Sequence, residues 1–269
     1  MTVAEVGGLI SQVLNDPQFW MLVGIGFCAQ LLDGAVGMGY GIIGSSFLLA
    51  LGLPPAQVSA MMHSAKVFTA STSGVSHFFL GNISPSLFWR LMPMGVIGGF
   101  VGASILINVP GEIIKPFILF YLMCMGAYIL KKAIGGTSLV VPHFNWAYPL
   151  GFVGGFLDAM GGGGWGPVTA TTLMGSGHQP RYVVGSVNAS EFFVTCAVVG
   201  ALFTAIVQGE LAVGLADYGI YVGGLVVGGL IAAPVAATFT RFAPPRVMLF
   251  VVGFLVIMMS VWQAINLFL

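Results

Sequence analysis

Four apolar segments of membrane-spanning length constrain the fold more than any other feature of the sequence. They cover residues 86–108, 113–130, 211–239 and 247–267, and two further segments, 56–80 and 181–207, are as long but contain polar residues. About 20 apolar residues form a helix long enough to cross the hydrocarbon core of a bilayer. Because lipid offers no hydrogen-bond partners, a spanning chain is either helical or a closed barrel. The sequence therefore predicts an all-α integral membrane protein.

The composition supports this prediction and excludes one class of partner. Of the 269 residues, 58% are apolar and 6% are charged, and the mean hydropathy is +1.01. A soluble domain has about a quarter of its residues charged, so the excess apolar surface predicts a lipid bilayer as the partner. The net charge is zero and no basic run is long enough to follow phosphates. We therefore expect no nucleic-acid partner.

Neither metal binding nor catalysis is indicated by the sequence. The cysteines, Cys28, Cys124 and Cys196, lie in apolar stretches without paired or metal-type spacing, so we expect small buried side chains. His63 and His77 are fourteen residues apart, not the three or four that place two ligands on one helical face. An enzyme needs a nucleophile and base, or metal ligands, that converge on a pocket. We expect no enzyme, no metal and no cofactor.

Two other apolar regions are interrupted by glycine. The first, 18–53, contains GAVGMGYG at 34–41, and the second, 147–175, contains AMGGGGWGP at 159–167. Each pattern predicts a short helix, a glycine-rich break and a second short helix. The breaks cannot face lipid, because their backbone N–H and C=O groups would lack partners.

The two interrupted regions are copies of each other at a constant shift of 125 residues. Twelve positions of the window 26–72 match without a gap, among them Asp33 with Asp158 and Gly41 with Gly166. The chain is therefore expected to contain two membrane repeats, 1–134 and 146–269, joined by a linker at 135–145. Five segments in each repeat, an odd number, make the copies antiparallel, which is the inverted-repeat plan of many secondary transporters.

The basic residues predict the orientation in the membrane. With five segments per repeat, six basic residues share one side and Lys115 alone lies on the other; the six are Arg90, Lys131, Lys132, Arg181, Arg241 and Arg246. Cytoplasmic loops carry the excess of Lys and Arg. We expect the linker in the cytoplasm and both termini outside.

The glycine-rich breaks are predicted to form an anion site near the midplane. A helix that begins after a break presents free N–H groups and the positive end of its dipole, and glycine lets an anion approach that backbone. The residues expected to take part are Gly37, Gly39, Tyr40, Gly41, Gly162, Gly163, Gly164, Trp165 and Gly166. The alternative is that glycine only permits close helix packing, which we expect for Gly98–Gly99 and Gly228–Gly229. The site interpretation predicts that Gly164→Val abolishes transport and leaves the folded yield largely intact.

Polar residues in the segments 56–80 and 181–207 are the second candidates. Lys66 and Glu191 occupy matching positions and carry opposite charges, and their neighbours His63 and Asn188 also match. Ionisable groups at bilayer depth are usually paired or face water. Lys66 and Glu191 are therefore predicted to meet, either as a structural ion pair or in binding the substrate or a proton.

Asp33 and Asp158 precede the two breaks and have two possible roles. They can accept N–H groups at the break, or they can bind a coupling cation or proton. The sequence leaves both alternatives open.

The motifs in both copies resemble one known family. GMGYG followed by LGLPPAQVSAMMHSAKVFTASTSGV, and GGGGWGPV followed by GHQPRYVVGSVNASEFF, resemble the sulfite exporter TauE/SafE family over nearly the whole chain. The resemblance implies a permease of the bacterial inner membrane for a sulfur-containing anion such as sulfite or an organosulfonate. It also points to both breaks, with Lys66, Asn188 and Glu191 beside them. An anion channel and a carrier of an unrelated solute are the alternatives, and a homo-oligomer is left open.

Overall fold

The structure is a computed structural model that describes residues 3–109, 111–135, 146–175, 178–207 and 215–240, with single residues or pairs between 246 and 265. The described residues form helices and no strand. In chain order the helices are α1 (Val3–Asn15), α2 (Pro17–Val36), α3 (Tyr40–Ala50), α4 (Pro55–Phe79), α5 (Pro85–Asn108), α6 (Gly111–Gly135), α7 (Ala147–Gly161), α8 (Trp165–Gly175), α9 (Pro180–Val207) and α10 (Leu215–Phe239). The predicted linker lies almost entirely outside the described residues, as does most of the predicted span 247–267.

Proline opens several of these helices. Pro17, Pro55 and Pro85 stand at the first helical position of α2, α4 and α5, where the missing N–H has no intrahelical partner in any case. At α2 the preceding Asp16 also caps the helix, because its Oδ1 accepts the N–H of Gln18 at 2.7 Å. Local sequence therefore sets these helix starts. Helix α1 was not predicted from the sequence, because no segment was expected before residue 18.

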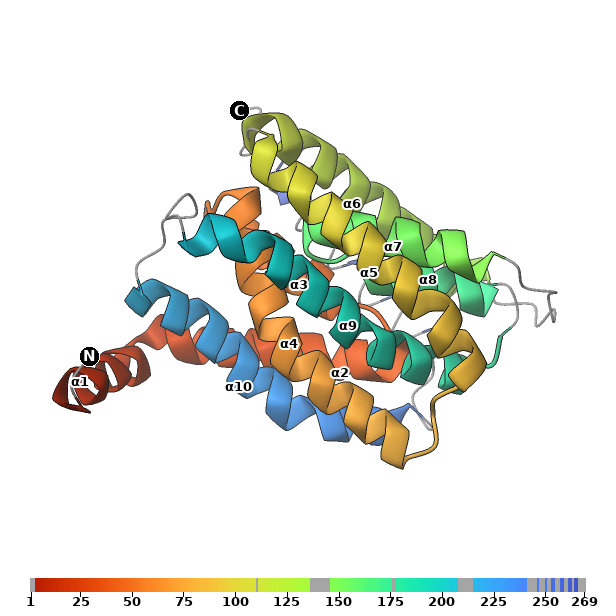
Figure 1. Cartoon of the computed structure of the whole chain (residues 1–269), viewed down its shortest axis with the longest axis horizontal. Helices are drawn as coiled ribbons and strands as arrows, with labels where there is room; N and C mark the ends of the chain where they lie inside the picture. The colour runs from red at the N-terminus through yellow and green to blue at the C-terminus, as the bar shows by residue number, and fades with distance from the viewer. Residues whose placement is uncertain are drawn as a thin grey trace.

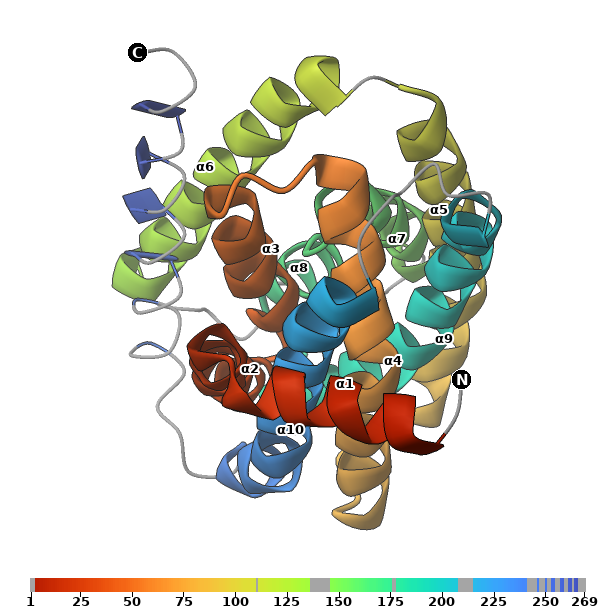
Figure 2. The ribbon, with the colours of Figure 1, turned by 90° about the vertical axis from the view of Figure 1, so that its left-hand side faces the viewer.

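The most extensive helix contacts join a helix before residue 135 to one after residue 146. The pairs are α2 with α10, α5 with α7, α5 with α9, α4 with α9 and α4 with α10. In Figure 1, α2 lies along α10 and α5 lies along α7. The short helices α3 and α8 lie inside the group of longer helices (Figure 2). The two parts of the chain are therefore interwoven around α3 and α8.

Glycine allows two of these helix pairs to approach closely. A Cβ at Gly26 of α2 would lie 2.5 Å from the carbonyl oxygen of Leu225 in α10, and a Cβ at Gly151 of α7 would lie 2.5 Å from that of Leu91 in α5. Residues 26 and 151 are matching positions of the two copies. Gly98 and Gly228 also face carbonyl groups of the partner helix. These glycines pack helices, as small residues do in membranes.

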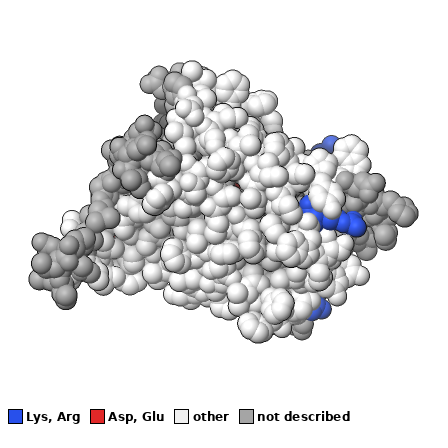
Figure 3. Space-filling view, in the orientation of Figure 1, with Lys and Arg blue, Asp and Glu red and all other residues white. Residues whose placement is uncertain are grey.

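The outer surface of the molecule is suited to lipid. Within the described residues, four helical stretches are long and apolar enough to cross a membrane: Pro17–Val36, Pro85–Asn108, Arg181–Phe203 and Tyr218–Phe239. The face in Figure 3 is almost free of charged groups, and its Lys and Arg side chains gather at the right-hand end. Cys28, Cys124 and Cys196 lie on this outer surface, so the expectation that they are buried is wrong. Their apolar surroundings are consistent with lipid instead of a protein core.

Candidate functional site

The segments between α2 and α3 and between α7 and α8 have matching backbone geometry. The first begins at Gly37, with φ 79° and ψ 22°, and the second begins at Gly162, with φ 70° and ψ 10°. These left-handed values favour glycine, which has no Cβ to clash. The Gly37 N–H donates to the Asp33 carbonyl and the Gly162 N–H to the Asp158 carbonyl, both at 2.6 Å. We call residues 37–39 the first loop and residues 162–164 the second loop.

An aspartate side chain bridges each loop. Asp33 Oδ1 accepts the N–H of Tyr40, the first residue of α3, at 3.3 Å. Asp158 Oδ1 accepts the N–H of Trp165, the first residue of α8, at 3.2 Å. Both aspartates therefore take the first of their two predicted roles, since each satisfies a backbone donor at a helix N-terminus.

Each loop packs against the first turn of the helix that follows the other loop. A Cβ at Gly41 would clash with the carbonyl oxygen of Gly162, and a Cβ at Gly166 would clash with that of Gly37. The 125-residue shift relates these two contacts, because Gly41 corresponds to Gly166 and Gly37 corresponds to Gly162. Residues 33–41 and 161–167 are buried throughout. The glycines are therefore required for backbone contact, whatever else they bind.

One prediction about these glycines is wrong. A Cβ at Gly164 would lie 2.5 Å from both the Leu157 carbonyl carbon and the Asp158 nitrogen. Backbone atoms cannot move aside as a flexible side chain can. Gly164→Val is therefore expected to disturb folding, and it cannot serve as a clean test of transport. Gly163 is equally enclosed, because its Cβ would meet the backbone of Gly41 and Ile42.

Lys66 of α4 lies at the centre of a buried polar cluster, which we call the Lys66 cluster: His63, Lys66, Asp158 and Glu191. Lys66 Nζ is 2.5 Å from Glu191 Oε1, and it lies 3.1 Å and 3.3 Å from Asp158 Oδ1 and Oδ2. The predicted meeting of Lys66 and Glu191 is confirmed. The participation of Asp158 as a second partner was not predicted.

His63 holds the other side of Asp158. Its Nε2 is 3.0 Å from Asp158 Oδ2, and its Nδ1 is 2.8 Å from the Ser59 carbonyl oxygen. Since a carbonyl only accepts, Nδ1 carries a proton and donates to Ser59. Ser59 Oγ in turn donates to the Ala159 carbonyl at 2.7 Å. The start of α4 is thus tied to the end of α7 beside the second loop.

Asn188 does not bond to the Lys66 cluster. It accepts a hydrogen bond from Ser73 Oγ at 2.8 Å and donates to the Val184 carbonyl at 3.0 Å. Asn188 is buried on α9, one turn before Glu191. It therefore joins α4 to α9, and any contact with a substrate stays a prediction.

Tyr40 and Trp165 begin α3 and α8 and are almost wholly buried. The Tyr40 hydroxyl donates to the Leu225 carbonyl at 3.1 Å, and Trp165 Nε1 donates to the Val187 carbonyl at 3.0 Å. Each ring fixes the start of a short helix against a neighbouring helix. Their side-chain donors are used inside the protein, so a contact with substrate stays a prediction.

Three buried polar atoms lack a hydrogen-bond partner within the described part of the chain. They are Gln30 Nε2, Ser45 Oγ and Thr195 Oγ1. Ser45 lies beside the second loop, since a Cβ at Gly162 would clash with its Oγ. Thr195 lies one turn after Glu191 on α9. An unsatisfied buried polar group is costly, at about 1–3 kcal/mol, so these hydroxyls suit a polar ligand. In the sequence, Ser45 and Thr195 could have been noticed as hydroxyl side chains inside apolar segments.

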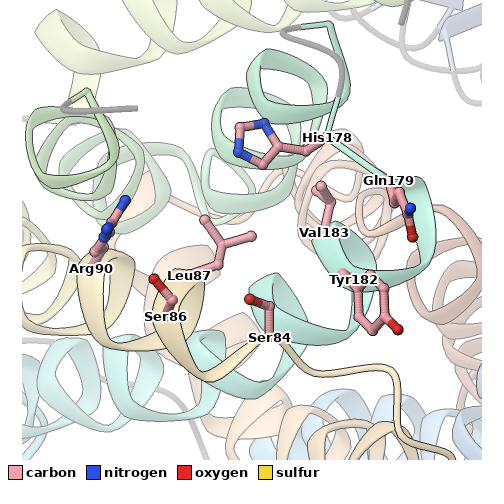
Figure 4. A pocket seen from close by; sticks show the side chains of 8 residues that line it. All are labelled: Ser84, Ser86, Leu87, Arg90, His178, Gln179, Tyr182 and Val183. Atoms are coloured by element: carbon pink, nitrogen blue, oxygen red, sulfur yellow. The ribbon is translucent and has the colours of Figure 1, made fainter. Parts of the chain in front are cut away.

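A separate pocket of about 210 Å³ lies near the starts of α5 and α9. Its lining residues are Ser84, Ser86, Leu87, Arg90, His178, Gln179, Tyr182 and Val183. Figure 4 shows α5 on one side, and the start of α9 with the residues before it on the other. Sequence reasoning missed this pocket, because its walls come from turns about 95 residues apart in the chain.

Comparison with known proteins places the chain in a family. The family model described as sulfite exporter TauE/SafE matches residues 22–262. The chain belongs to the TauE/SafE family. This membership confirms the resemblance drawn from the sequence motifs.

A curated relative of the same kind comes from Bacillus subtilis (strain 168) and is named "Probable membrane transporter protein YtnM". It is 38% identical over 251 residues, which cover 90% of this chain and 81% of the relative. No solved structure matches the chain. Family membership and the four candidate spans identify a multi-pass membrane transporter.

Proposed function

We propose that this TauE/SafE protein is a secondary transporter of a small sulfur-containing anion such as sulfite or an organosulfonate. One observation carries the proposal: among the Lys and Arg side chains that the structure describes, only Lys66 is buried, and it lies beside the second loop. A buried ammonium group is the side chain that an anion would pair with inside the membrane. The family description, sulfite exporter, supports the choice of a sulfur oxyanion.

The proposed binding site lies between the Lys66 cluster and the two loops. Lys66 supplies the positive charge, and the unpartnered hydroxyls of Ser45 and Thr195 supply neutral donors for anion oxygens. The N-termini of α3 and α8, whose first N–H groups Asp33 and Asp158 accept, add the positive ends of two helix dipoles. The burial of the loops and of the cluster supports a site that is closed to both sides of the membrane in this arrangement.

The transport mechanism that we propose uses two inverted repeats, 1–134 and 146–269. The matched loops, the matched aspartate caps and the exchange of glycine contacts support a twofold relation between the repeats. In such transporters broken helices meet near the midplane, and one part of the protein rocks against the other to open each side in turn. The interwoven pairs, α2 with α10 and α5 with α7, would then move as units.

We further propose a bacterial plasma membrane location, with the linker in the cytoplasm and the termini outside. Support comes from the basic residues. Arg181 donates to the carbonyl groups of Leu80 and Gly81 at the end of α4, and Arg90 lines the pocket near the start of α5. Both arginines therefore lie near the turn between α4 and α5, on the side where the positive-inside rule places the cytoplasm. Nothing in this proposal calls for catalysis or a cofactor.

The test is counterflow of a labelled anion in liposomes that contain the purified protein. Vesicles loaded with unlabelled sulfite, thiosulfate or methanesulfonate should take up the labelled anion above its equilibrium level for a limited time. A channel gives no such overshoot, because it does not exchange one solute molecule for another. Lys66→Met should abolish counterflow, while Lys131→Met, which removes an exposed lysine, should retain it. Absence of counterflow with every sulfur anion tried would contradict the proposal.

A further inference from the structure

The charges around Lys66 do not balance. Three buried carboxyl groups, those of Asp33, Asp158 and Glu191, surround one buried ammonium group, that of Lys66. Even with His63 protonated, this part of the structure has one negative charge in excess if all three acids are ionised. A net charge inside the membrane is expensive, and a carboxyl group there commonly becomes neutral by taking up a proton.

The hydrogen bonds indicate which carboxyl group can gain and lose a proton during transport. Asp158 accepts hydrogen bonds from Lys66 and the Trp165 N–H, and from His63 Nε2 when both ring nitrogens of His63 carry protons. These donors stabilise its ionised form. Within the described residues, Glu191 has Lys66 as its one charged partner, and it shares that partner with Asp158. Glu191 can therefore lose its partner without leaving Lys66 unpaired.

We propose that Glu191 takes up a proton when the substrate anion binds Lys66, so that anion and proton cross the membrane together. The inference rests on the proposed function. In this step a proton from water binds the Glu191 carboxylate and the ion pair with Lys66 breaks. Lys66 remains an ammonium group and pairs with the anion. On release the anion leaves, Glu191 returns its proton to water on the far side, and the ion pair forms again.

Uptake of one proton together with one monovalent anion leaves the net charge of the site unchanged. One negative charge arrives with the substrate and one is neutralised by the proton. The other titratable groups around Glu191 are Asp33 from α2, Tyr40 from α3, His63 and Lys66 from α4 and Asp158 from α7. Among these, Asp33 is the alternative proton site, because its side chain accepts one backbone N–H.

A metal cation fits this site less well than a proton. Among the residues that the structure describes, no group of three or more His, Cys, Asp and Glu side chains could hold a metal ion. Lys66 Nζ already lies between the carboxylates of Asp158 and Glu191. A proton needs only a single carboxyl group and no further coordination.

The experiment measures proton movement with an anion that does not itself carry protons. Methanesulfonate and thiosulfate stay fully ionised, so a proton flux reports the protein. Liposomes with the full chain, a clamped membrane potential and an internal pH dye are tested with whichever of the two anions shows counterflow. We expect internal acidification that requires the anion, and a pH gradient that raises accumulation by about tenfold per pH unit for one proton per monovalent anion.

Two variants locate the proton. Glu191→Gln mimics the protonated acid, so we expect the response of anion accumulation to a pH gradient to disappear, at whatever rate of anion exchange the variant retains. Asp33→Asn should keep that response. Counterflow by the wild-type protein without proton movement would overturn the coupling and leave the proposed function intact. Loss of the pH response in Asp33→Asn, with retention in Glu191→Gln, would also overturn the assignment. If Glu191→Gln fails to fold, the proton flux of the wild-type protein still decides whether coupling exists.

Discussion

The two loops begin with the same backbone geometry and have the same aspartate cap, but the two aspartates have different charged neighbours. Each follows a helix that ends in a left-handed glycine, and each is bridged by an aspartate that accepts the first N–H of the next helix. At the first loop Asp33 has no direct ion pair within the described residues. At the second loop Asp158 also binds Lys66 and His63.

This difference separates the features that both loops have from those that only the second loop has. The caps and the glycine contacts occur in both copies, so they belong to the scaffold. The charged partners occur once, because position 66 is lysine and its counterpart, position 191, is glutamate. A symmetric scaffold thus carries an asymmetric polar cluster, and we assign the function to the asymmetric part.

The largest expected effect comes from neutralising the two aspartates separately. Removing one partner of a buried ion pair costs about 3–5 kcal/mol in soluble proteins, whereas losing a single hydrogen bond costs about 1 kcal/mol. Asp158→Asn should therefore lower the unfolding temperature in detergent far more than Asp33→Asn. Thermal unfolding of both variants measures the difference. Equal losses would mean that the charged partners of Asp158 contribute nothing to stability.

A smaller effect, and an equal one in the two copies, is expected from alanine at the loop contacts. Gly41→Ala and Gly166→Ala each force a Cβ against a carbonyl oxygen of the opposite loop. Overpacking of this kind costs about 1–3 kcal/mol. Gly200→Ala is the control, because a Cβ there meets nothing within 4 Å. Melting curves should show similar losses for both loop variants and none for the control, and a loss in only one loop would break the symmetry of the scaffold.

The smallest effect is expected from Tyr40→Phe. The variant keeps the ring and removes the hydroxyl that donates to the Leu225 carbonyl at 3.1 Å. The loss is about 1 kcal/mol, the usual net value of one hydrogen bond, and transport should continue. An abolished counterflow in a folded Tyr40→Phe protein would show that the hydroxyl contacts the substrate.

The sequence predicted the parts of the site that depend on the duplication. A shift of 125 residues was enough to pair Lys66 with Glu191. The positions of Asp33 and Asp158 before the breaks gave capping as one of two possible roles, and the structure shows the caps. The helical class followed from the apolar segments, since lipid limits the choice of backbone structure.

Other parts depend on distances between helices that no repeat pattern contains. Asp158 reaches Lys66 because the end of α7 packs against α4, and the sequence places these residues 92 positions apart. The close contact between Gly164 and the backbone of Leu157 and Asp158 could not be read from the sequence either, so the folding effect of Gly164→Val was not foreseen. Glycine composition alone does not distinguish backbone in contact with other backbone from backbone that is open to a ligand.

The central claim is that Lys66 is the group to which the transported anion binds. The most direct test is counterflow by the double variant Lys66→Met/Glu191→Gln, which removes both charges of the ion pair together. Because Glu191 is not left ionised without Lys66, and Asp158 keeps its contact with His63, the double variant should fold better than Lys66→Met by itself. We predict that it elutes as a folded protein and shows no counterflow of any sulfur anion. Counterflow at the wild-type rate by the folded double variant would contradict the claim.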